Sequence, residues 1–580
     1  MDDSYIANNI YDFFIDTNEK ILTIKNNSGS FQIWEEETNT QLSNFNGNVE
    51  EIIFSESKEY GLVKVERIHR EQTIWYKLCM NSYTFSLLEI PVEIGEGEVS
   101  FIKQVKNFWY VSVCNEMEDN NLNYKVNLNL NKWEKIYEGE ILDVTVDEKQ
   151  IIFLERLDFT SFKICLYNTN SKLSKEICTD INLTYGSFIN EDTFVYSYNT
   201  DSGSKLVLYY ISKDLHVPIE FHHNFISNIV HYSEDQLIVT TEYGMIDTIW
   251  KFTLSTLTAS KIKYPGKVIK KALVSNHYIY SLMCSPEDKG SIYKKFICST
   301  FWERVTDNCI KETVLMKPSF LKYETFDNLS IEAMLYTVSP SAPTIVWLHG
   351  GPHERARATY SPQVQLLLSL GFNVFIPNIR GSTGYGLNFQ KLSERNWGNE
   401  PAKDVIHGIE YLINRGLIKE RRVVFSGISY GGYLSLLLAG KYPEYTLASI
   451  NLFGPTDLIE FIHHSPTNWK DYMKEWLGDV NEDFALLVND SPITYYTSIS
   501  APILIVYGMD DLRVNPACIE PYINLLRVSK KGVEVLPLQD HGHDYVNNTT
   551  EEMIFQKIID FLRRIKTIRG ATNEYISKNL

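Results

Sequence analysis

A strand-to-helix turn around Ser429 places the strongest restriction on how this chain can fold. The apolar run Val423–Phe425 has the length of a buried strand and leads into Gly427-Ile428-Ser429-Tyr430-Gly431, and a helix-like apolar run follows at residues 434–439. A strand that bends sharply into a helix leaves no room for side chains at the bend, which explains the two flanking glycines, and the bend pushes the serine hydroxyl out of the sheet. The pattern predicts a nucleophile elbow at Ser429, with a plain tight turn as the alternative.

The segments around this turn alternate between strand and helix. From Thr344 onward, nearly continuous apolar runs are separated by helical periods, and residues 320–338 before them also have strand character. This alternation predicts a parallel sheet covered on both faces. The expected strands are Thr344–Leu348, Asn373–Ile376, Val423–Phe425, Ala448–Phe453, Ile503–Tyr507 and Val533–Leu536. One expected helix runs through Val405 and Ile409 and ends near Gly416, and another runs through Ile554 and Ile558.

The first 308 residues have a different pattern, in which short β-type runs follow one another with hardly any helical period. Residues 51–90 and 143–178 each contain four such runs separated by polar turns. The expected units begin near Val49, Val99, Ile141, Ile181, Ile226 and Val268, at intervals of 40 to 50 residues, with one more unit before them. Four strands per unit predict a seven-bladed propeller, in which each small sheet buries its faces against its neighbours. A pair of β-sandwiches is the alternative.

Composition limits the partners of the chain. Hydrophobic residues make up 44% and aromatic residues 13% of the 580 residues, as in a folded globular protein. The formal charge of −18 and the lack of a Lys/Arg stripe predict neither a nucleic acid nor a membrane as partner. An acidic start and the lack of an apolar run of about 18 residues predict a cytoplasmic protein. Eight cysteines without Cys-x-x-Cys spacing predict reduced thiols and no metal site. No cofactor is expected, and a homo-oligomer is compatible with the sequence.

A serine hydroxyl is a poor nucleophile, so Ser429 needs a general base and an acidic group that orients the base. In a fold of this kind both groups follow later strands, in the chain order serine, acid, histidine. The loop after the fifth expected strand offers Asp510 and Asp511, and the loop after the last one offers His541 and His543. Spacing alone leaves both choices open.

Six motifs occur in order along the second half. They are His349-Gly350-Gly351-Pro352, Asn378-Ile379-Arg380-Gly381-Ser382-Thr383-Gly384-Tyr385-Gly386, Gly427-Ile428-Ser429-Tyr430-Gly431-Gly432-Tyr433, Ser491-Pro492-Ile493, Gly508-x-x-Asp511-x-Arg513-Val514 and Gly542-His543. Together they resemble the catalytic domain of the prolyl oligopeptidase family, and most of all its acylaminoacyl-peptidase branch. The resemblance implies a triad of Ser429, Asp511 and His543, which leaves Asp510 and His541 as loop residues.

The resemblance also implies two domains: an all-β propeller at residues 1–310, and an α/β-hydrolase domain with a mostly parallel sheet at residues 311–580. The implied function is a serine peptidase that forms an acyl-enzyme and acts on short peptides or N-acylated peptides, with the propeller limiting substrate size. The same triad serves any acyl transfer, so an esterase, a thioesterase or a specialised amidase on a peptide-like metabolite is an alternative. A non-catalytic propeller scaffold is a further alternative, and the sequence favours it less.

Five further residues are expected to support the reaction. The natural oxyanion donors are the backbone N–H groups of Tyr430 and Gly351. Arg513 resembles the family residue that holds a substrate carbonyl, and an ion pair with the triad acid is its alternative role. His349 and Arg380 are expected to brace the site.

Paired glutamates hold a free substrate amine in dipeptidyl-type relatives. The pairs within Glu35-Glu36-Glu37 and at Glu50-Glu51 come too early in the chain for that role. A free substrate N-terminus is therefore not expected to be required.

The chain departs from the family pattern at a few positions. Asn515 stands where a proline is usual, and Asp327-Asn328 stands where Asp-Gly is usual. His541 and Asp544 beside the expected catalytic histidine are also unusual, and ionisable groups so close are expected to affect the pH optimum or the substrate preference.

Overall fold

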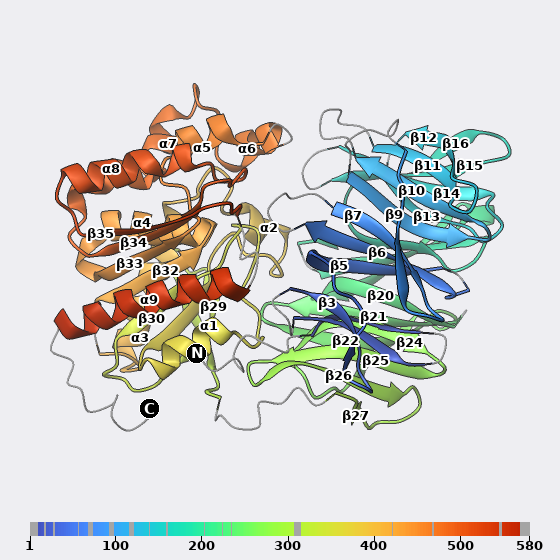
Figure 1. Ribbon diagram of the computed structural model, residues 1–580, viewed down its shortest axis with the longest axis horizontal. Helices are drawn as coiled ribbons and strands as arrows, with labels where there is room; N and C mark the ends of the chain where they lie inside the picture. Colours follow the sequence, from blue (N-terminus) through green and yellow to red (C-terminus); the bar gives the residue numbers. More distant parts are fainter. Residues whose placement is uncertain are drawn as a thin grey trace. The chain divides into compact units, whose positions relative to one another are not determined.

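The computed structural model describes residues 10–568 apart from 17–18, 27–29, 56, 68–72, 92–97, 115–120, 139, 158–160, 202, 223, 234, 307–314, 420, 467–468 and 544–547. Contacts between residues divide the described chain into two compact units, residues 10–306 and residues 315–568 (Figure 1). The expected domain boundary at residues 310 and 311 lies outside the described residues.

The described part of the first unit consists of small antiparallel sheets with strands in sequence order. The first three sheets contain β1 (Ile10–Ile15), β2 (Ile21–Lys25), β3 (Gln32–Glu35) and β4 (Thr40–Gln41); β5 (Gly47–Phe54), β6 (Tyr60–Arg67), β7 (Thr73–Cys79) and β8 (Thr84–Leu87); and β9 (Glu98–Val105), β10 (Phe108–Cys114), β11 (Asn121–Asn127) and β12 (Lys132–Glu138). The last two contain β20 (Phe225–Ser233), β21 (Gln236–Tyr243), β22 (Ile246–Thr253) and β23 (Thr258–Ile262); and β24 (Val268–Ser275), β25 (Tyr278–Ser285), β26 (Asp288–Phe296) and β27 (Glu303–Arg304). These blade-like sheets confirm the propeller predicted from the strand pattern, and the number of blades stays a prediction.

A seven-stranded sheet lies between these two groups. Its strands are β13 (Glu140–Val144), β14 (Gln150–Arg156), β15 (Phe162–Asn168), β16 (Leu173–Phe188), β17 (Thr193–Thr200), β18 (Gly203–Tyr210) and β19 (Leu215–His222), and a 3₁₀ turn at Ile211–Lys213 precedes the last. The first part of β16 pairs with β15 as far as Ile181, and the rest pairs with β17 from Asn182 onward. Asp180 has a φ of 56° at this change of partner. The expected unit start at Ile181 therefore falls inside a continuous strand.

Neighbouring sheets of the first unit are joined by buried apolar clusters and by side-chain hydrogen bonds. The carboxylate of Asp143 in β13 accepts a hydrogen bond of 2.8 Å from the ammonium of Lys103 in β9 of the preceding sheet. In the same way, Asp247 in β22 accepts one of 2.7 Å from the N–H of Ile269 in the next sheet. Each sheet thus completes its own core only against the next one, as a propeller requires.

The first and last sheets of this unit also contact each other. Strand β1 lies against β24 and β26. Phe13 and Ile15 of β1 share a buried cluster with Leu282 and Ile292 of the last sheet, and the ammonium of Lys271 lies 2.9 Å from the carboxylate of Asp12. Among the described strands no hydrogen-bonded ladder joins these two sheets, so side chains close the ring.

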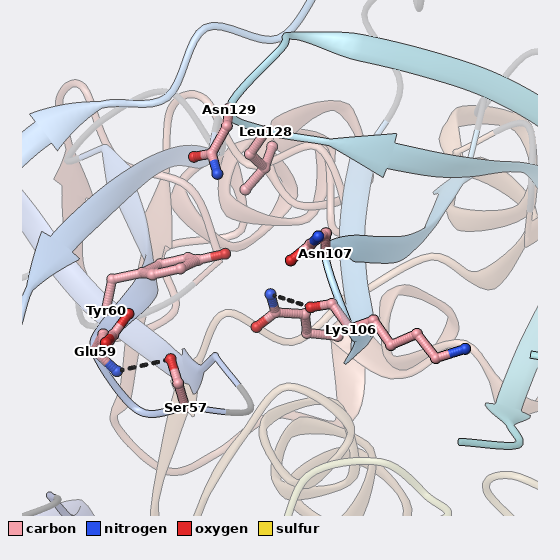
Figure 2. A pocket seen from close by; sticks show the side chains of 8 residues that line it. Ser57, Glu59, Tyr60, Lys106, Asn107, Leu128 and Asn129 are labelled. Atoms are coloured by element: carbon pink, nitrogen blue, oxygen red, sulfur yellow. Dashed lines mark hydrogen bonds between the residues drawn. The ribbon is translucent and has the colours of Figure 1, made fainter. Parts of the chain in front are cut away.

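A polar cavity of about 440 Å³ lies at the hairpin ends of the second and third sheets (Figure 2). The Tyr60 hydroxyl oxygen in its wall accepts a hydrogen bond of 2.9 Å from the indole N–H of Trp109. The Lys106 ammonium is 3.2 Å from the carboxylate of Glu148. Leu128 is the one aliphatic side chain among the lining residues, which are Ser57, Glu59, Tyr60, Gln104, Lys106, Asn107, Leu128 and Asn129. This wall lacks the apolar surface that small-molecule sites usually present.

The second unit is built on an eight-stranded sheet in the order β28-β29-β31-β30-β32-β33-β34-β35. The strands are β28 (Ser319–Glu324), β29 (Ser330–Tyr336), β30 (Thr344–Leu348), β31 (Asn373–Asn378), β32 (Val423–Ile428), β33 (Thr446–Leu452), β34 (Ile503–Gly508) and β35 (Val533–Leu538). The pairs β28–β29 and β29–β31 are antiparallel, and the other pairs are parallel. This sheet confirms the predicted α/β domain, with each apolar run from Thr344 onward forming a strand.

Helices lie on both sides of this sheet (Figure 1). They are α1 (Pro362–Ser369), α2 (Leu387–Lys391), α3 (Glu400–Asn414), α4 (Tyr430–Lys441), α5 (Leu458–His464), α6 (Lys470–Trp476), α7 (Phe484–Asp490), α8 (Glu520–Val528) and α9 (Asn548–Ile568), with 3₁₀ turns at Pro443–Tyr445, Pro492–Ser498 and Pro516–Cys518. Side chains of α3, α4 and α8 share one apolar cluster with β30, β31 and β32, while α1 and α9 contact β31 and β34. Because both faces are covered, every residue of β31, β33 and β34 is buried.

No helix in the described ranges is both long enough and apolar enough to span a membrane. Six cysteines have described side chains, and all six are free thiols. Cys165, Cys284 and Cys518 are buried, whereas Cys298 is exposed.

Candidate active site

Ser429 lies in the sharp turn between β32 and α4. Its φ of 52° and ψ of −117° are unusual for a residue with a side chain, as expected of a nucleophile elbow. A Cβ atom at Gly427 would lie 2.6 Å from the carbonyl oxygen of Leu348, and one at Gly431 would lie 2.2 Å from the same oxygen. Both glycines are therefore required, because β30 passes directly beside the turn.

Three polar side chains meet at the carboxyl ends of parallel strands. Nε2 of His543 lies 3.0 Å from the hydroxyl oxygen of Ser429, and Nδ1 of the same ring lies 2.7 Å from Oδ2 of Asp511. Asp511 follows β34, His543 follows β35, and their exposed fractions are only 1% and 8%. The sheet thus brings together three residues that are far apart in the sequence.

The backbone of its own loop holds the carboxylate of Asp511. Its Oδ1 accepts hydrogen bonds from the backbone N–H of Arg513 at 2.9 Å and of Val514 at 2.7 Å. With Oδ1 held in this way, Oδ2 is directed at His543. Sequence reasoning had considered only the side chain of Arg513, which is exposed, and missed this contribution of the backbone.

The two neighbouring residues that spacing could not reject have other surroundings. Asp510 is exposed, and its backbone N–H donates a hydrogen bond of 2.9 Å to the carbonyl oxygen of His541. The ring of His541 lies 2.7 Å from the carbonyl oxygen of Gln539 and 2.6 Å from the hydroxyl of Thr550. The structure does not bring Asp510 and His541 into the group around Ser429, and Asp544 lies outside the described residues.

Close approach of two loops explains the glycine before Asp511. A Cβ atom at Gly508 would lie 2.2 Å from the carbonyl oxygen of Gly542 and 2.4 Å from that of His541. Only glycine therefore lets the acid loop and the histidine loop come into direct contact here.

The loop after β30, which carries Gly351, is fastened to the loop after β31. Gly351 has a φ of 112°. The backbone N–H of Thr383 donates to the carbonyl of Glu354 at 3.0 Å, and the amide oxygen of Asn378 accepts from the N–H of Ala356 at 2.8 Å. The first turn of α4 leaves the N–H of Tyr430 without an acceptor inside the helix. The site therefore has fixed backbone donors beside Ser429 on α4, and a rigid loop at Gly351.

His349 is a buried support of the same loop. Its Nδ1 lies 2.7 Å from the carbonyl oxygen of Gly350, and its Nε2 lies 2.8 Å from the hydroxyl of Ser382. Burial lowers the pKa of His349 to about 4, so its ring is neutral at neutral pH. The carbonyl can only accept, which places the ring hydrogen on Nδ1.

Arg380 is also buried, with 1% of its surface exposed. Its guanidinium donates to Asp404 at 2.8 and 2.9 Å and to Asp327 at 3.1 and 3.2 Å, and it lies 4.6 Å from the ring centre of Phe326. These contacts tie the start of the sheet to α3. The guanidinium of Arg380 thus makes its hydrogen bonds within the domain.

Two departures from the family pattern have physical explanations. Asn328 has a φ of 65°, and asparagine tolerates this left-handed conformation better than most residues other than glycine. Asn515 accepts a hydrogen bond of 3.0 Å from the N–H of Ala517 and so caps the 3₁₀ turn that follows.

Sequence reasoning missed two supports of the elbow. The side-chain amide of buried Asn451 in β33 accepts a hydrogen bond of 2.7 Å from the N–H of Gly454 and donates one of 2.9 Å to the carbonyl oxygen of Gly454. In the same strand, the carbonyl oxygen of Leu452 accepts a hydrogen bond of 2.8 Å from the backbone N–H of Ser429. The Tyr430 hydroxyl donates to the carbonyl of Trp397 at 2.8 Å. An amide side chain within a run predicted to be a buried central strand was the available signal for Asn451.

Within the described residues, no group of three or more His, Cys, Asp or Glu side chains is arranged to hold a metal ion. The arrangement of Ser429, His543 and Asp511 is of a kind suited to nucleophilic acyl transfer.

Curated proteins with similar sequences match only part of the chain. The Caenorhabditis elegans dipeptidyl peptidase family member 6 is 29% identical over 212 residues, which cover 35% of this chain and 29% of that protein. Acylamino-acid-releasing enzyme 2 of Oryza sativa subsp. japonica is 26% identical over 306 residues, or 47% of this chain and 40% of that protein. The mouse acylamino-acid-releasing enzyme is 30% identical over 215 residues, or 35% and 29%. The matches thus span well under half the length of these relatives.

Solved structures match over nearly the whole chain. A crystal structure of puromycin hydrolase has a TM-score of 0.84 at 12% identity and covers 97% of this chain and 95% of its own. The Pyrococcus horikoshii acylaminoacyl peptidase has a TM-score of 0.76 at 14% identity, with 97% of both chains covered. At such identities the likeness concerns the fold, and it agrees with a propeller followed by an α/β-hydrolase domain. Residues 358–567 match the model of the prolyl oligopeptidase family, and this part of the chain is a domain of that family.

Proposed function

We propose that this chain is a serine peptidase that hydrolyses short peptides or N-acylated peptides through an acyl-enzyme on Ser429. The observation that carries the proposal is the unbroken line of hydrogen-bonding groups from Asp511 through His543 to Ser429, at 2.7 and 3.0 Å. A serine in such a line has a base to take its proton and a carboxylate to stabilise the imidazolium that forms.

In the first half of the reaction, Oγ of Ser429 attacks the carbonyl carbon of the scissile amide while its proton moves to Nε2 of His543. The tetrahedral intermediate collapses when the C–N bond breaks and Nε2 returns that proton to the departing amine. In the second half a water molecule attacks the acyl-enzyme in the same way, and the Ser429 oxygen leaves with the proton held by His543. Asp511 keeps Nδ1 protonated throughout.

The oxyanion that forms in both halves needs fixed donors. In our proposal these are the backbone N–H groups of Tyr430 and Gly351. The Tyr430 N–H belongs to the first turn of α4, and the Gly351 loop is held by Asn378 and Thr383. Removing one such donor typically costs about a hundredfold to a thousandfold in kcat.

The surroundings of the early glutamates favour substrates with a blocked N-terminus. Glu35 is hydrogen-bonded to Lys20 and Thr38, and the carboxylate of Glu36 lies 3.1 Å from the ammonium of Lys25. These carboxylates are engaged inside the first unit, which supports a site that does not select a free amine. The acylamino-acid-releasing relatives agree with this substrate class.

Two further parts of the proposal concern substrate binding. The exposed side chain of Arg513 would hold a peptide carbonyl, and the propeller unit would limit substrates to short peptides. Support comes from the family motif around Arg513 and from the presence of a propeller in the same chain.

The test is a cleavage profile over matched free and N-acetylated peptides of increasing length, up to a denatured protein. We expect cleavage of the short acetylated peptides, none of the denatured protein, and loss of all cleavage in Ser429→Ala. Labelling of Ser429 by a fluorophosphonate would report the nucleophile independently of the substrate. An Arg513→Ala variant is expected to raise KM more than it lowers kcat.

The alternatives give different outcomes in the same experiment. Faster hydrolysis of matched esters or thioesters, with no peptide cleaved, would identify an esterase or thioesterase. Hydrolysis of puromycin, with no peptide cleaved, would indicate an amidase of peptide-like metabolites. Puromycin is a suitable probe because one structurally similar protein is a puromycin hydrolase. A folded protein whose Ser429 is not labelled at all would contradict the proposal and favour a non-catalytic scaffold.

A further inference from the structure

The position of His543 depends on the short loop that carries it. The loop leaves the sheet at the end of β35 and joins α9, whose first residue is Asn548. His543 itself contacts Ser429 and Asp511, and it needs to keep both distances for a proton to move along the line. What holds this loop in place therefore decides how well the site is organised.

His541, two residues earlier, connects this loop to two other parts of the domain. Its Nδ1 lies 2.7 Å from the carbonyl oxygen of Gln539, the first residue of the same loop after β35. Its Nε2 lies 2.6 Å from the hydroxyl of Thr550 in the first turn of α9. Its own carbonyl oxygen accepts a hydrogen bond of 2.9 Å from the backbone N–H of Asp510, next to Asp511. One residue thus bonds within its own loop, to the last helix and to the acid loop.

The partners of His541 define its chemical role. Because a carbonyl oxygen can only accept, Nδ1 carries the hydrogen, and Nε2 is then the acceptor for the Thr550 hydroxyl. Both ring nitrogens are used in this way, so neither is directed at the substrate side of Ser429. The His541 ring is suited to fixing geometry and not to moving protons.

The backbone around His541 leaves little room for adjustment. A Cβ atom at Gly508 would lie 2.4 Å from the His541 carbonyl oxygen, so the acid loop and the histidine loop already touch. A shift of His541 would therefore be passed to Asp510 and to the Gly542–His543 peptide together. Both partners in the hydrogen bond between Asp511 and His543 would move.

We propose that His541 is a positioning residue, which holds the loops of His543 and Asp511 in register by bonding to Gln539, Thr550 and Asp510. The proposal rests on the proposed hydrolase function of Ser429 and adds to it a residue outside the triad. It also assigns Thr550 a role in activity, although this residue belongs to a different element.

The test uses variants that remove one contact at a time. His541→Asn keeps a donor near the position of Nδ1 and loses the bond to Thr550, while Thr550→Val loses the same bond from the other side. We expect each variant to lower kcat by about tenfold to a hundredfold with KM changed less than about twofold, because small misplacements of catalytic groups have effects of this size. The double variant is expected to be no worse than the single ones, since both changes remove one interaction.

Three controls make the result decisive. Thr550→Ser keeps the hydroxyl and is expected to retain most of kcat, whereas His407→Asn changes an exposed histidine of α3 and is expected to have no effect. Thermal unfolding of each variant reports whether the fold survives. If Thr550→Val does not fold, His541→Asn and Thr550→Ser still test the proposal.

The rate of fluorophosphonate labelling separates this inference from the proposed function. If the unaltered protein is not labelled at Ser429, the proposed function fails. If it is labelled, and folded His541→Asn and Thr550→Val react at the same rate as the parent with unchanged kcat, the positioning role of His541 is wrong. Additive losses in the double variant would also contradict it.

Discussion

His349 shows how burial of a single side chain couples this site to pH. Its folded-state pKa is about 4 because burial disfavours the charged ring, whereas the ordinary value is 6.5. The unfolded chain therefore takes up the proton first as the pH falls. The stabilising contribution is complete above about pH 6.5 and is lost as the pH falls toward 4, and the loss then amounts to about 3 kcal/mol.

The substitution His349→Asn tests this coupling, because the asparagine amide can still donate to the carbonyl of Gly350. We expect the variant to be less stable at pH 7, but to lose less of its free energy of unfolding between pH 7 and pH 4.5 than the parent does. Urea unfolding, followed by hydrogen exchange in peptides of the second unit, would measure both slopes. The exposed His407→Asn variant should keep the parental slope, and parallel curves for His349→Asn and the parent would contradict the argument.

The choice of site residues shows the limit of sequence reasoning at this scale. The elbow at Ser429 could be predicted because its two glycines and the flanking apolar runs have a steric cause. Asp510 and Asp511, like His541 and His543, are too close in sequence for spacing to separate, and the resemblance alone selected between them. Their different surroundings depend on hydrogen bonds to backbone groups, such as those that Asp511 accepts, and no pattern of side chains encodes these.

At the scale of elements, two glycines of the second unit allow a matched comparison. A Cβ atom at Gly431 would meet the backbone oxygens of Leu348 at 2.2 Å and of His349 at 2.7 Å. Gly416, just after α3, has a φ of 67°, but a Cβ atom added there would meet no atom of the described residues within 4 Å. The first glycine is required by packing, and the second only by its backbone conformation.

We therefore expect Gly431→Ala to lower the free energy of unfolding of the second unit by about 3 kcal/mol or more, since neither strand nor helix can move away. Gly416→Ala should cost about 1 kcal/mol, the usual penalty for a left-handed residue with a side chain. Chemical denaturation of both variants checks the difference. Equal losses would show that the crowding between β30 and α4 is relieved more easily than the distances indicate.

The strands were predicted better than their grouping. Apolar runs such as Ile503–Tyr507 became buried strands because a sheet covered on both faces favours apolar residues along its strands. The expected unit start at Ile181 fell inside β16, because the change of partner there occurs without a turn. Turn residues are the signal that sequence reasoning uses to separate units, and here the chain has only a left-handed residue at Asp180.

At the scale of the whole molecule, closure of the first unit depends on side chains of its first and last sheets. Phe13 is fully buried in the cluster that β1 shares with β25 and β26. We expect Phe13→Ala to cost about 3 to 5 kcal/mol and to speed hydrogen exchange in β1 and in β25 together. Exchange measured by mass spectrometry would detect both segments at once.

Phe153→Ala is the matched control, because Phe153 is equally buried in a cluster between β10, β13 and β14. It should speed exchange in those strands and leave β25 unchanged. A Phe13→Ala variant in which only β1 exchanges faster would contradict closure through this cluster.

The continuous strand β16 has a consequence for how the propeller tolerates changes in its sequence. Insertions are tolerated best at exposed turns, where they break no strand pairing. Between β15 and β17 the chain offers no such turn, since a single strand belongs to the pairing of both. An insertion within β16 would therefore change the register of two ladders at once.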